Sequence, residues 1–356
     1  MTIAVGDVVV GAGLLRHVGA RCAAAVPGAH RWAVCIDATV DGHHGSTVRA
    51  SFAEAPSWHV VPSGERHKTR DTWGRLTDAL LAAGHGRDSA VCAVGGGVTG
   101  DIAGFVAATY LRGIPVVQVP TTLLAMVDAS IGGKTGLDVP AGKNLVGAFH
   151  PPAAVVVDPT VLATLSPAER RAGFAEMLKH GVVADASHFL ALADAAPALL
   201  ADGAAADLLA DAIAASVRIK AGIVAADPTE QGQRAVLNFG HTLAHAVEQV
   251  TGYAVRHGEA VAMGMVIEAR VGEQLGVTPR GVADTIAAAL RRAGLPYEVP
   301  ADLPADDLLA AMRLDKKARQ ATVRCALPAA LGTMARDDDR WTIAVPDTAW
   351  RDALRR

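Results

Sequence analysis

The chain contains little cysteine. Its four cysteines, at positions 22, 35, 92 and 325 of 356 residues, are far apart, and none shows C-x-x-C spacing. Cysteines in this number and spacing suggest neither a disulfide framework nor a thiolate zinc site. We therefore expect neither, and we expect the protein to work in a reducing compartment, the cytoplasm.

An excess of positive charge and a long apolar run are also missing. Lysine and arginine number 33 against 36 acidic residues, a net charge of −3, so we expect no nucleic-acid partner. No uninterrupted apolar stretch reaches the roughly 18 residues of a membrane span. The N-terminal segment MTIAVGDVVVGAG lacks the basic region and long apolar segment of a signal peptide. We expect no membrane association.

Length and apolar content are what the chain does have. Hydrophobic residues make up 51% of the chain, which is enough to form buried cores. A chain of 356 residues is longer than a single hydrophobic core usually accommodates, so two domains are predicted, 1–162 and 163–356. In the first, apolar runs alternate with helical patterns, which predicts an α/β domain with a mainly parallel sheet. Strands are predicted at residues 5–10, 32–36, 58–61, 89–94, 115–119 and 153–157, and helices at 14–25, 70–83 and 98–110.

Helical periodicity dominates the second half, which predicts a mostly α-helical domain. Helices are predicted at residues 167–183, 206–225, 236–250, 259–275, 282–293 and 304–314, and residues 321–327 and 341–345 are expected to pair as short strands.

A glycine-rich turn follows the predicted strand at 89–94. Gly95, Gly97 and Gly100 fit G-x-G-x-x-G before a helix, an arrangement that lets a phosphate approach backbone amides. A tight structural turn is the alternative in a chain with 36 glycines. The acidic residue that usually binds ribose about 20 positions later is absent, because the next strand ends in Thr121 and Thr122. A nucleotide is therefore expected, bound in a different way.

Polar side chains follow the other predicted strands of this half. Ligands of parallel sheets bind beyond the carboxyl ends of the strands. The residues at these ends are Asp37 and Thr39, then Gly64, Glu65 and Lys68, and then Asp101 behind the glycines. We expect them to border the nucleotide.

Three polar clusters interrupt the apolar helices of the second half. His241 and His245 share one helix face, His257 opens HGEAVAMGM, and Glu176 lies in FAEMLKHG with Lys179 and His180. A carboxylate and imidazoles on separate helices suit an open catalytic zinc site. Each cluster alone also fits a buried core histidine or a surface ion pair. H-E-x-x-H is absent, which disfavours a zinc peptidase.

Isolated cations form a third group. Most stand beside apolar or glycine neighbours rather than in solvated charge runs, which favours a pocket for phosphate or carboxylate. They are Lys134, Lys143, Lys220, Arg234, Lys316 and Lys317, of which the last two also fit plain surface charge.

Taken in order, these segments resemble one family. The strings are PSGERHK, GGGVTGDIAGF, RGIPVVQVPTTLLAMVDASIGGKTG, GKNLVGAFHPP, GFAEMLKHG, LNFGHTLAHAVE, HGEAVAMGM and DKKAR. They resemble the 3-dehydroquinate synthases, which belong to the sugar phosphate cyclases and share their fold with metal-dependent polyol dehydrogenases. Thr39 stands where the family pattern D-x-N has asparagine.

The resemblance implies roles for matching positions. Metal ligands, for Zn²⁺ or Co²⁺, would be Glu176, His241 and His257. NAD would be bound by Asp37, Glu65, Lys68, Gly96, Gly97, Asp101, Thr121, Thr122, Lys143 and Thr164. Catalytic residues would be Asp128, Lys134, Asn144, Lys179 and His245. Substrate would be bound by Arg112, Lys220, Arg234, Asn238, Lys316 and Lys317, with Arg112 reaching the neighbouring subunit of a homodimer.

The resemblance also implies a reaction of the shikimate pathway of aromatic amino-acid biosynthesis. A phosphorylated sugar acid, 3-deoxy-D-arabino-heptulosonate 7-phosphate, would become 3-dehydroquinate and phosphate by transient oxidation, elimination, re-reduction and an aldol step. Lys220 and Arg234 match a carboxylate-binding pair. The alternatives left open are an amino-dehydroquinate synthase, another sugar phosphate cyclase and a polyol dehydrogenase.

Overall fold

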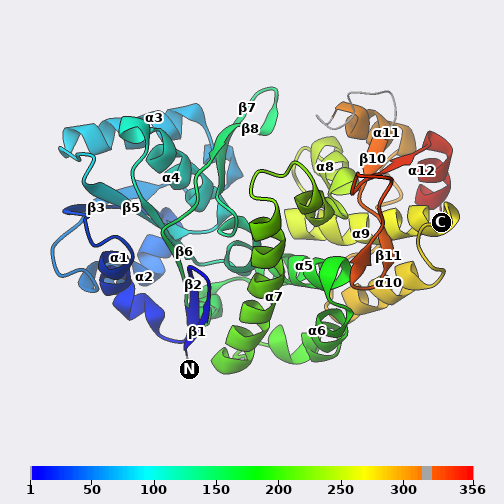
Figure 1. Cartoon of the computed structure of the whole chain (residues 1–356), viewed down its shortest axis with the longest axis horizontal. Coiled ribbons are helices and arrows are strands. Elements are labelled where there is room, and N and C mark those ends of the chain that lie inside the picture. The colour runs from blue at the N-terminus through cyan, green and yellow to red at the C-terminus, as the bar shows by residue number, and fades with distance from the viewer. Residues whose placement is uncertain (1, 315–322, 356) are drawn as a thin grey trace. The chain divides into compact units, whose positions relative to one another are not determined.

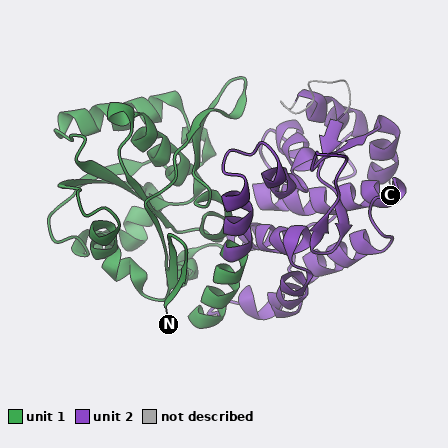
Figure 2. Ribbon diagram, in the orientation of Figure 1, with its two compact units in different colours: residues 1–166, 205–217 green, residues 167–204, 218–356 purple. Residues whose placement is uncertain are grey.

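The computed structural model describes residues 2–314 and 323–355 (Figure 1). The chain folds into two compact units, residues 1–166 with 205–217 and residues 167–204 with 218–356 (Figure 2). Among the described residues, no helix is both long and apolar enough to cross a membrane.

The first unit contains a seven-stranded sheet in the order β1-β2-β9-β6-β5-β3-β4. Its strands are β1 (Thr2–Val5), β2 (Val8–Gly11), β3 (Arg31–Asp37), β4 (Ser57–Val61), β5 (Ser89–Gly95), β6 (Val116–Pro120) and β9 (Ala154–Val157). All neighbours are parallel except β1 and β2, so the predicted α/β fold is confirmed. The single strand predicted at 5–10 is wrong: Gly6, at φ 60°, turns the chain, and Val5 pairs with Val8.

Helices cover this sheet. They are α1 (Val18–Ala25), α2 (Ala38–Ala50), α3 (Arg70–Ala82) and α4 (Gly97–Thr109), and a separate hairpin is formed by β7 (Lys134–Val139) and β8 (Gly142–Phe149). The sequence did not predict α2 or the hairpin. The α2 segment ATVDGHHGSTVRA has two glycines and β-branched residues, which are poor helix formers. Asp37 supports it by accepting hydrogen bonds from the amides of Thr39 and Val40.

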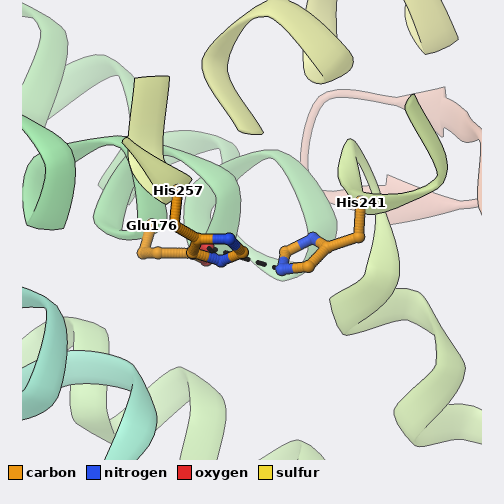
Figure 3. A group of neighbouring side chains, drawn as sticks. All are labelled: Glu176, His241 and His257. Atoms are coloured by element: carbon orange, nitrogen blue, oxygen red, sulfur yellow. Dashed lines mark ion pairs between the residues drawn. The ribbon is translucent and has the colours of Figure 1, made fainter. Parts of the chain in front are cut away.

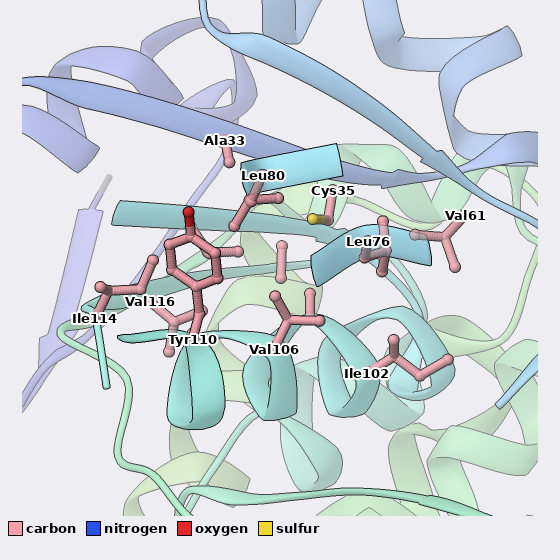
Figure 4. Packing of buried hydrophobic residues seen from close by; sticks show 14 residues of the cluster. Ala33, Cys35, Val61, Leu76, Leu80, Ile102, Val106, Tyr110, Ile114 and Val116 are labelled. Atoms are coloured by element: carbon pink, nitrogen blue, oxygen red, sulfur yellow. The ribbon is translucent and has the colours of Figure 1, made fainter. Parts of the chain in front are cut away.

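The core of the first unit lies between its sheet and the helices α3 and α4. Figure 4 shows Leu76 and Leu80 of α3 and Ile102 and Val106 of α4 among the packed side chains. Every residue of β5 is buried, as expected for a central parallel strand covered on both faces. This packing holds the carboxyl ends of β3, β5 and β6 in place.

The second unit is mostly helical. Its helices are α5 (Pro167–Ala184), α6 (Ala186–Leu199), α8 (His241–Val250), α9 (His257–Gln274), α10 (Val282–Arg292), α11 (Ala305–Leu314) and α12 (Asp347–Leu354). Helix α7 (Ala206–Ala226) begins in the first unit, which includes residues 205–217. The short strands are β10 (Val323–Cys325), β11 (Pro328–Ala330), β12 (Thr333–Met334) and β13 (Ile343–Val345). The predicted pairing near the C-terminus is confirmed by antiparallel β10 and β13.

One predicted helix is divided in two. Residues 236–250 were expected as one helix, but a 3-10 turn (Gln233–Asn238) ends before Gly240, and α8 starts after it. Gly240 has φ 82°, a left-handed conformation that interrupts a helix. The break places His241 at the first position of α8. Helices α6 and α12 were not predicted, and α6 even contains Pro197 near its end.

Candidate active site

Glu176, His241 and His257 come together in the second unit from three helices. Glu176 lies within α5, while His241 and His257 are the first residues of α8 and α9. Both imidazole Nε2 atoms lie 3.5 Å from Glu176 Oε1, and one possible ligand atom from each residue lies within 4.8 Å of the others. Figure 3 shows the two rings directed at the carboxylate. The structure thus assembles the three residues expected as metal ligands.

The other nitrogen of each imidazole has its own acceptor. His241 Nδ1 lies 3.2 Å from the carbonyl oxygen of Phe239, and His257 Nδ1 lies 3.3 Å from Glu248 Oε2. A carbonyl or carboxylate oxygen can only accept, so each Nδ1 carries the proton. In its neutral form each imidazole then has its lone pair on Nε2, directed at the shared site, which is the tautomer that metal-binding histidines adopt.

Charge at this site favours a cation. Glu176 is fully buried and pairs with Lys179, three residues later on α5. Burial lowers the pKa of His241 well below its ordinary value, and the Lys179 cation lowers it further. Burial also acts to lower the pKa of His257, but hydrogen bonds with Glu176 and Glu248 outweigh it and raise the pKa to about 10. A divalent ion would meet the same demand for positive charge.

A glycine at the second position of α9 lets the start of this helix lie close to α5. A Cβ on Gly258 would lie 2.0 Å from the carbonyl oxygen of Ala172, so α9 starts directly against the backbone of α5, one turn before Glu176. The start of α9 is closed by Glu259, whose Oε2 accepts from the Arg256 amide at 3.4 Å. His257 is fixed between these two contacts.

The donor set fits a metal ion. One carboxylate and two imidazoles are ligands that Zn²⁺ and Co²⁺ accept, and three protein ligands leave a coordination position for substrate, as in catalytic zinc sites. The buried carboxylate and the two Nδ1–H groups with acceptors are the supporting arrangement such ions need. Glu176, His241 and His257 are the residues that would hold it.

Two other expected residues of the second unit, His245 and Lys179, lie beside this group. The exposed His245 ring lies 5.6 Å from the His241 ring and 6.4 Å from the His257 ring, measured between centroids. Lys179, Lys220 and Arg234 are all buried cations. Buried cations in proteins are paired with anionic or hydrogen-bonding groups, and Lys179 is paired with Glu176.

A short loop positions two of the expected substrate residues. Asp227 accepts hydrogen bonds from the amides of Gln231, Gly232 and Arg234 at 2.9, 2.7 and 3.0 Å. These bonds, the one from Gln231 first, lower the pKa of Asp227. In the same segment, Asn238 Nδ2 donates to Glu230 Oε1 at 2.6 Å. The loop therefore has a defined shape before any ligand binds.

In the first unit, Lys68 joins two other expected residues. Its Nζ lies 2.5 Å from Asp101 Oδ2 at the start of α4 and 2.5 Å from Asn144 Oδ1 of β8. Asn144 has φ 54°, a conformation that asparagine tolerates. Lys143 also pairs with Glu65, at 3.4 Å. Five expected residues thus form one group beside the ends of β4 and β5.

The glycine turn is confirmed as the end of β5 and the start of α4. Gly96 precedes α4 and Gly97 is its first residue. A Cβ on Gly96 would meet Thr122 Cγ2 at 3.1 Å, so this turn packs closely on the end of β6. Among the described residues, the buried Thr121 hydroxyl at that end makes no hydrogen bond. A close-packed amide turn beside an unused hydroxyl fits a phosphate-bearing cofactor.

The remaining expected residues are spread over the first unit. Asp37 is used locally, since its Oδ1 accepts from Thr39, Val40 and the Ser63 hydroxyl. Thr164 donates to the Val161 carbonyl oxygen at 2.9 Å. Three others lie on connections or strand starts: Arg112 after α4, Asp128 in the π-helical turn Ala125–Ala129, and Lys134 at the start of β7. Lys316 and Lys317 lie outside the described residues.

Three carboxylates near the site were not among the residues expected from sequence. They are Asp227, Glu248 and Glu268, and each accepts from a backbone amide or from an imidazole. Glu248 belongs to the string HTLAHAVE, and its position on the same helix as His241 is the only local signal it carries. The other two have no sequence pattern that distinguishes them from surface acids.

Comparison with known proteins agrees with the family resemblance. The family described as 3-dehydroquinate synthase N-terminal matches residues 58–172, and 3-dehydroquinate synthase C-terminal matches residues 173–318. A 3-dehydroquinate synthase of Xanthomonas oryzae pv. oryzae (strain MAFF 311018) is 46% identical over 343 residues, covering 93% of this chain and 90% of that protein.

Solved structures share the whole fold. The 2-epi-5-epi-valiolone synthase from Streptomyces hygroscopicus subsp. jinggangensis 5008, with NAD⁺ and Zn²⁺ bound, has a TM-score of 0.87 at 30% identity, over 99% of this chain and 97% of that one. A 2-deoxy-scyllo-inosose synthase complexed with carbaglucose-6-phosphate, NAD⁺ and Co²⁺ has the same fold, with a TM-score of 0.87 at 24% identity over 100% and 99%. Matches that run through both units, at this level of identity, show that the chain belongs to the 3-dehydroquinate synthase family.

Proposed function

We propose that this protein is a 3-dehydroquinate synthase, a phosphate-eliminating lyase that converts 3-deoxy-D-arabino-heptulosonate 7-phosphate into 3-dehydroquinate and phosphate. The observation that supports this most directly is the group formed by Glu176, His241 and His257, with both Nε2 atoms 3.5 Å from the buried carboxylate. It is a metal-type donor set inside a chain of this family.

The residues divide between the two cofactors. Zn²⁺ or Co²⁺, held by the second unit, would supply a Lewis acid for a substrate hydroxyl, and NAD, held by the first unit, would take up a hydride and return it. The glycine turn at Gly96 and Gly97 and the unused Thr121 hydroxyl support the NAD assignment. The cofactors named with the relatives of solved structure support both.

The protein's own groups bind and orient the substrate. Lys220 and Arg234, buried cations of the second unit, would hold its carboxylate. Lys179 would keep a positive charge beside Glu176. This positive charge would stabilise the negative charge that develops on the substrate when its hydroxyl loses a proton. Asn144, whose Oδ1 accepts from Lys68, would donate to substrate through its Nδ2. We also propose that the protein is cytoplasmic and that it forms a homodimer. Light scattering on the purified protein measures the oligomeric state.

Product identification tests this function. Purified protein with NAD and Zn²⁺ is given the heptulosonate phosphate, and we expect equal amounts of phosphate and 3-dehydroquinate without net NADH. NADH in proportion to product would instead indicate a dehydrogenase. Phosphate released only from the amino analogue of the substrate would indicate an amino-dehydroquinate synthase. The variant His257→Ala should lose turnover while remaining folded, and full activity in it would refute the proposed metal site.

A further inference from the structure

Glu268 is a fully buried carboxylate that bonds to the start of a neighbouring helix. It lies in the middle of α9, with 0% of its side chain exposed. Its Oε2 accepts from the Gly240 amide at 2.7 Å, and its Oε1 accepts from the Leu243 amide at 3.2 Å. These amides belong to the first turn of α8, where backbone donors have no partner within the helix. A negative charge there also suits the helix dipole.

A glycine contact presses the same turn onto α9. A Cβ on Gly264 would lie 1.9 Å from the carbonyl oxygen of Gly240, so only glycine fits at this position of α9. A Cβ on Gly240 would in turn lie 2.9 Å from Met265 Cγ and 3.0 Å from the Val261 carbonyl oxygen. The backbone before α8 is thereby held against α9 by shape, and Glu268 holds it by hydrogen bonds.

His241 lies directly between the two amides that Glu268 binds. It follows Gly240 in the chain and precedes Leu243 by two residues. Its Nδ1 donates to the carbonyl oxygen of Phe239, which belongs to the same turn. Any rotation of this turn would move both the imidazole and the acceptor that selects its tautomer.

We propose that Glu268 is a positioning residue for His241: by binding the Gly240 and Leu243 amides, it sets the place and direction of the imidazole that completes the metal group. The proposal rests on the proposed function, in which His241 is a metal ligand. Glu268 acts through the backbone of the turn that carries His241, because its two carboxylate oxygens accept from the amides on either side of that residue.

The substitution Glu268→Gln separates this role from simple space filling. The carboxylate uses one oxygen for each amide, whereas glutamine has one oxygen and one NH₂ group. One of the two amides would therefore face a donor instead of an acceptor. The side chain keeps its size, so the core is not opened.

The chain provides a matched control in Glu273, on the same helix. Glu273 Oε1 accepts from the amides of Gly281 and Ala283 at 3.0 and 2.9 Å, and these lie at the start of α10. Gly281 is left-handed, with φ 92°, as Gly240 is at α8. Helix α10 carries none of the three metal-group residues. Because one oxygen takes both amides, glutamine could keep these bonds, and Glu273→Ala is the variant that removes them.

The experiment measures Zn²⁺ affinity of the full-length protein by competition with a chromophoric chelator, and the Co²⁺ absorption spectrum as a report on ligand geometry. We expect Glu268→Gln to bind Zn²⁺ about tenfold more weakly and to show an altered Co²⁺ spectrum. Glu273→Ala should lose stability but keep both metal readouts. Unchanged affinity in Glu268→Gln, or an equal loss in the two variants, would overturn the proposal.

Two further measurements cover other failures. If wild-type protein binds no Zn²⁺, the proposed metal site itself fails, which is distinct from failure of the positioning role. If Glu268→Gln does not fold, amide hydrogen exchange on the wild type replaces it: Zn²⁺ should slow exchange at Gly240 and Leu243 and leave Gly281 and Ala283 unchanged. Equal slowing at both helix starts, or none at α8, would overturn the proposal.

Discussion

His257 Nδ1, at the start of α9, donates to Glu248 Oε2 of α8 at 3.3 Å. Helix α8, which itself begins with His241, therefore also supports the histidine at the start of α9. Glu248 is 4% exposed, which keeps water from competing for the bond. The two helices are therefore linked at the metal group in both directions, because Glu268 of α9 binds the start of α8.

Replacing Glu248 should weaken metal binding. Glu248→Gln keeps an acceptor for His257 but removes the charge that makes the imidazole a stronger ligand, and we expect Zn²⁺ affinity to fall about 10- to 100-fold. Competition with a chelator measures it. The control is Glu273→Gln, since Glu273 lies on the same helix but accepts from backbone amides at the start of α10 rather than from an imidazole. Equal affinities in the two variants would contradict the prediction.

Replacing Lys68 should destabilise the first unit. Its side chain is 4% exposed and its partner Asp101 is 20% exposed, so the pair is little screened by water. Lys68→Met removes the charged hydrogen bonds to Asp101 and Asn144, and the free energy of unfolding should fall by about 2 kcal/mol. Denaturant unfolding measures it. The control Arg75→Ala breaks an ion pair in which Arg75 is 58% and Asp71 is 82% exposed, and it should lower the free energy of unfolding by at most about 0.5 kcal/mol. A similar loss of stability in both variants would show that the burial of Lys68 has no effect.

Adding one methyl group at Gly264 should force α8 away from α9. The new Cβ would lie 1.9 Å from the Gly240 carbonyl oxygen, and backbone cannot yield as a side chain can. We expect Gly264→Ala to lower the free energy of unfolding by about 3 kcal/mol and to weaken Zn²⁺ binding. Gly222→Ala in α7 meets nothing within 4 Å and should raise stability by roughly 0.5 kcal/mol. Thermal unfolding compares the two, and a stable Gly264→Ala protein with normal metal affinity would contradict the close contact.

His188 should make the protein sensitive to mild acid. Burial, followed by the nearby His180, lowers its pKa from 6.5 to about 4. Because the folded-state pKa lies below that of the unfolded chain, the unfolded state binds the proton more readily between these values. Stability should be complete above pH 6.5 and fall as the pH decreases toward 4, by roughly 2 kcal/mol after allowance for partial exposure.

Unfolding at a series of pH values checks the role of His188. His188→Gln cannot take up a proton, so its stability should depend less on pH between 6.5 and 4. His30→Gln serves as the control at an exposed position, and it should retain the wild-type slope. The same slope in all three proteins would assign the acid sensitivity to other groups.

Much of the fold could be predicted because local sequence reflects burial on both sides of a strand or one side of a helix. The run at residues 89–94 reads as a buried strand, and β5 is buried at every residue. The α2 segment could not be recognised, because its helix depends on the Asp37 cap and packing rather than on propensity. Gly6 and Gly240 were visible as glycines, but their left-handed conformations, which divide the predicted strand and helix, come from the folded backbone.

For the site, the sequence by itself determined which residue types are present and their family: a carboxylate at 176 and imidazoles at 241 and 257, in segments that resemble 3-dehydroquinate synthases. Only the tertiary structure decided what supports them. Glu248 meets an imidazole nine residues later, and Glu268 meets an amide 28 residues earlier, across the contact between α8 and α9. Such pairs depend on how helices pack, and no local pattern of charge or spacing encodes that packing.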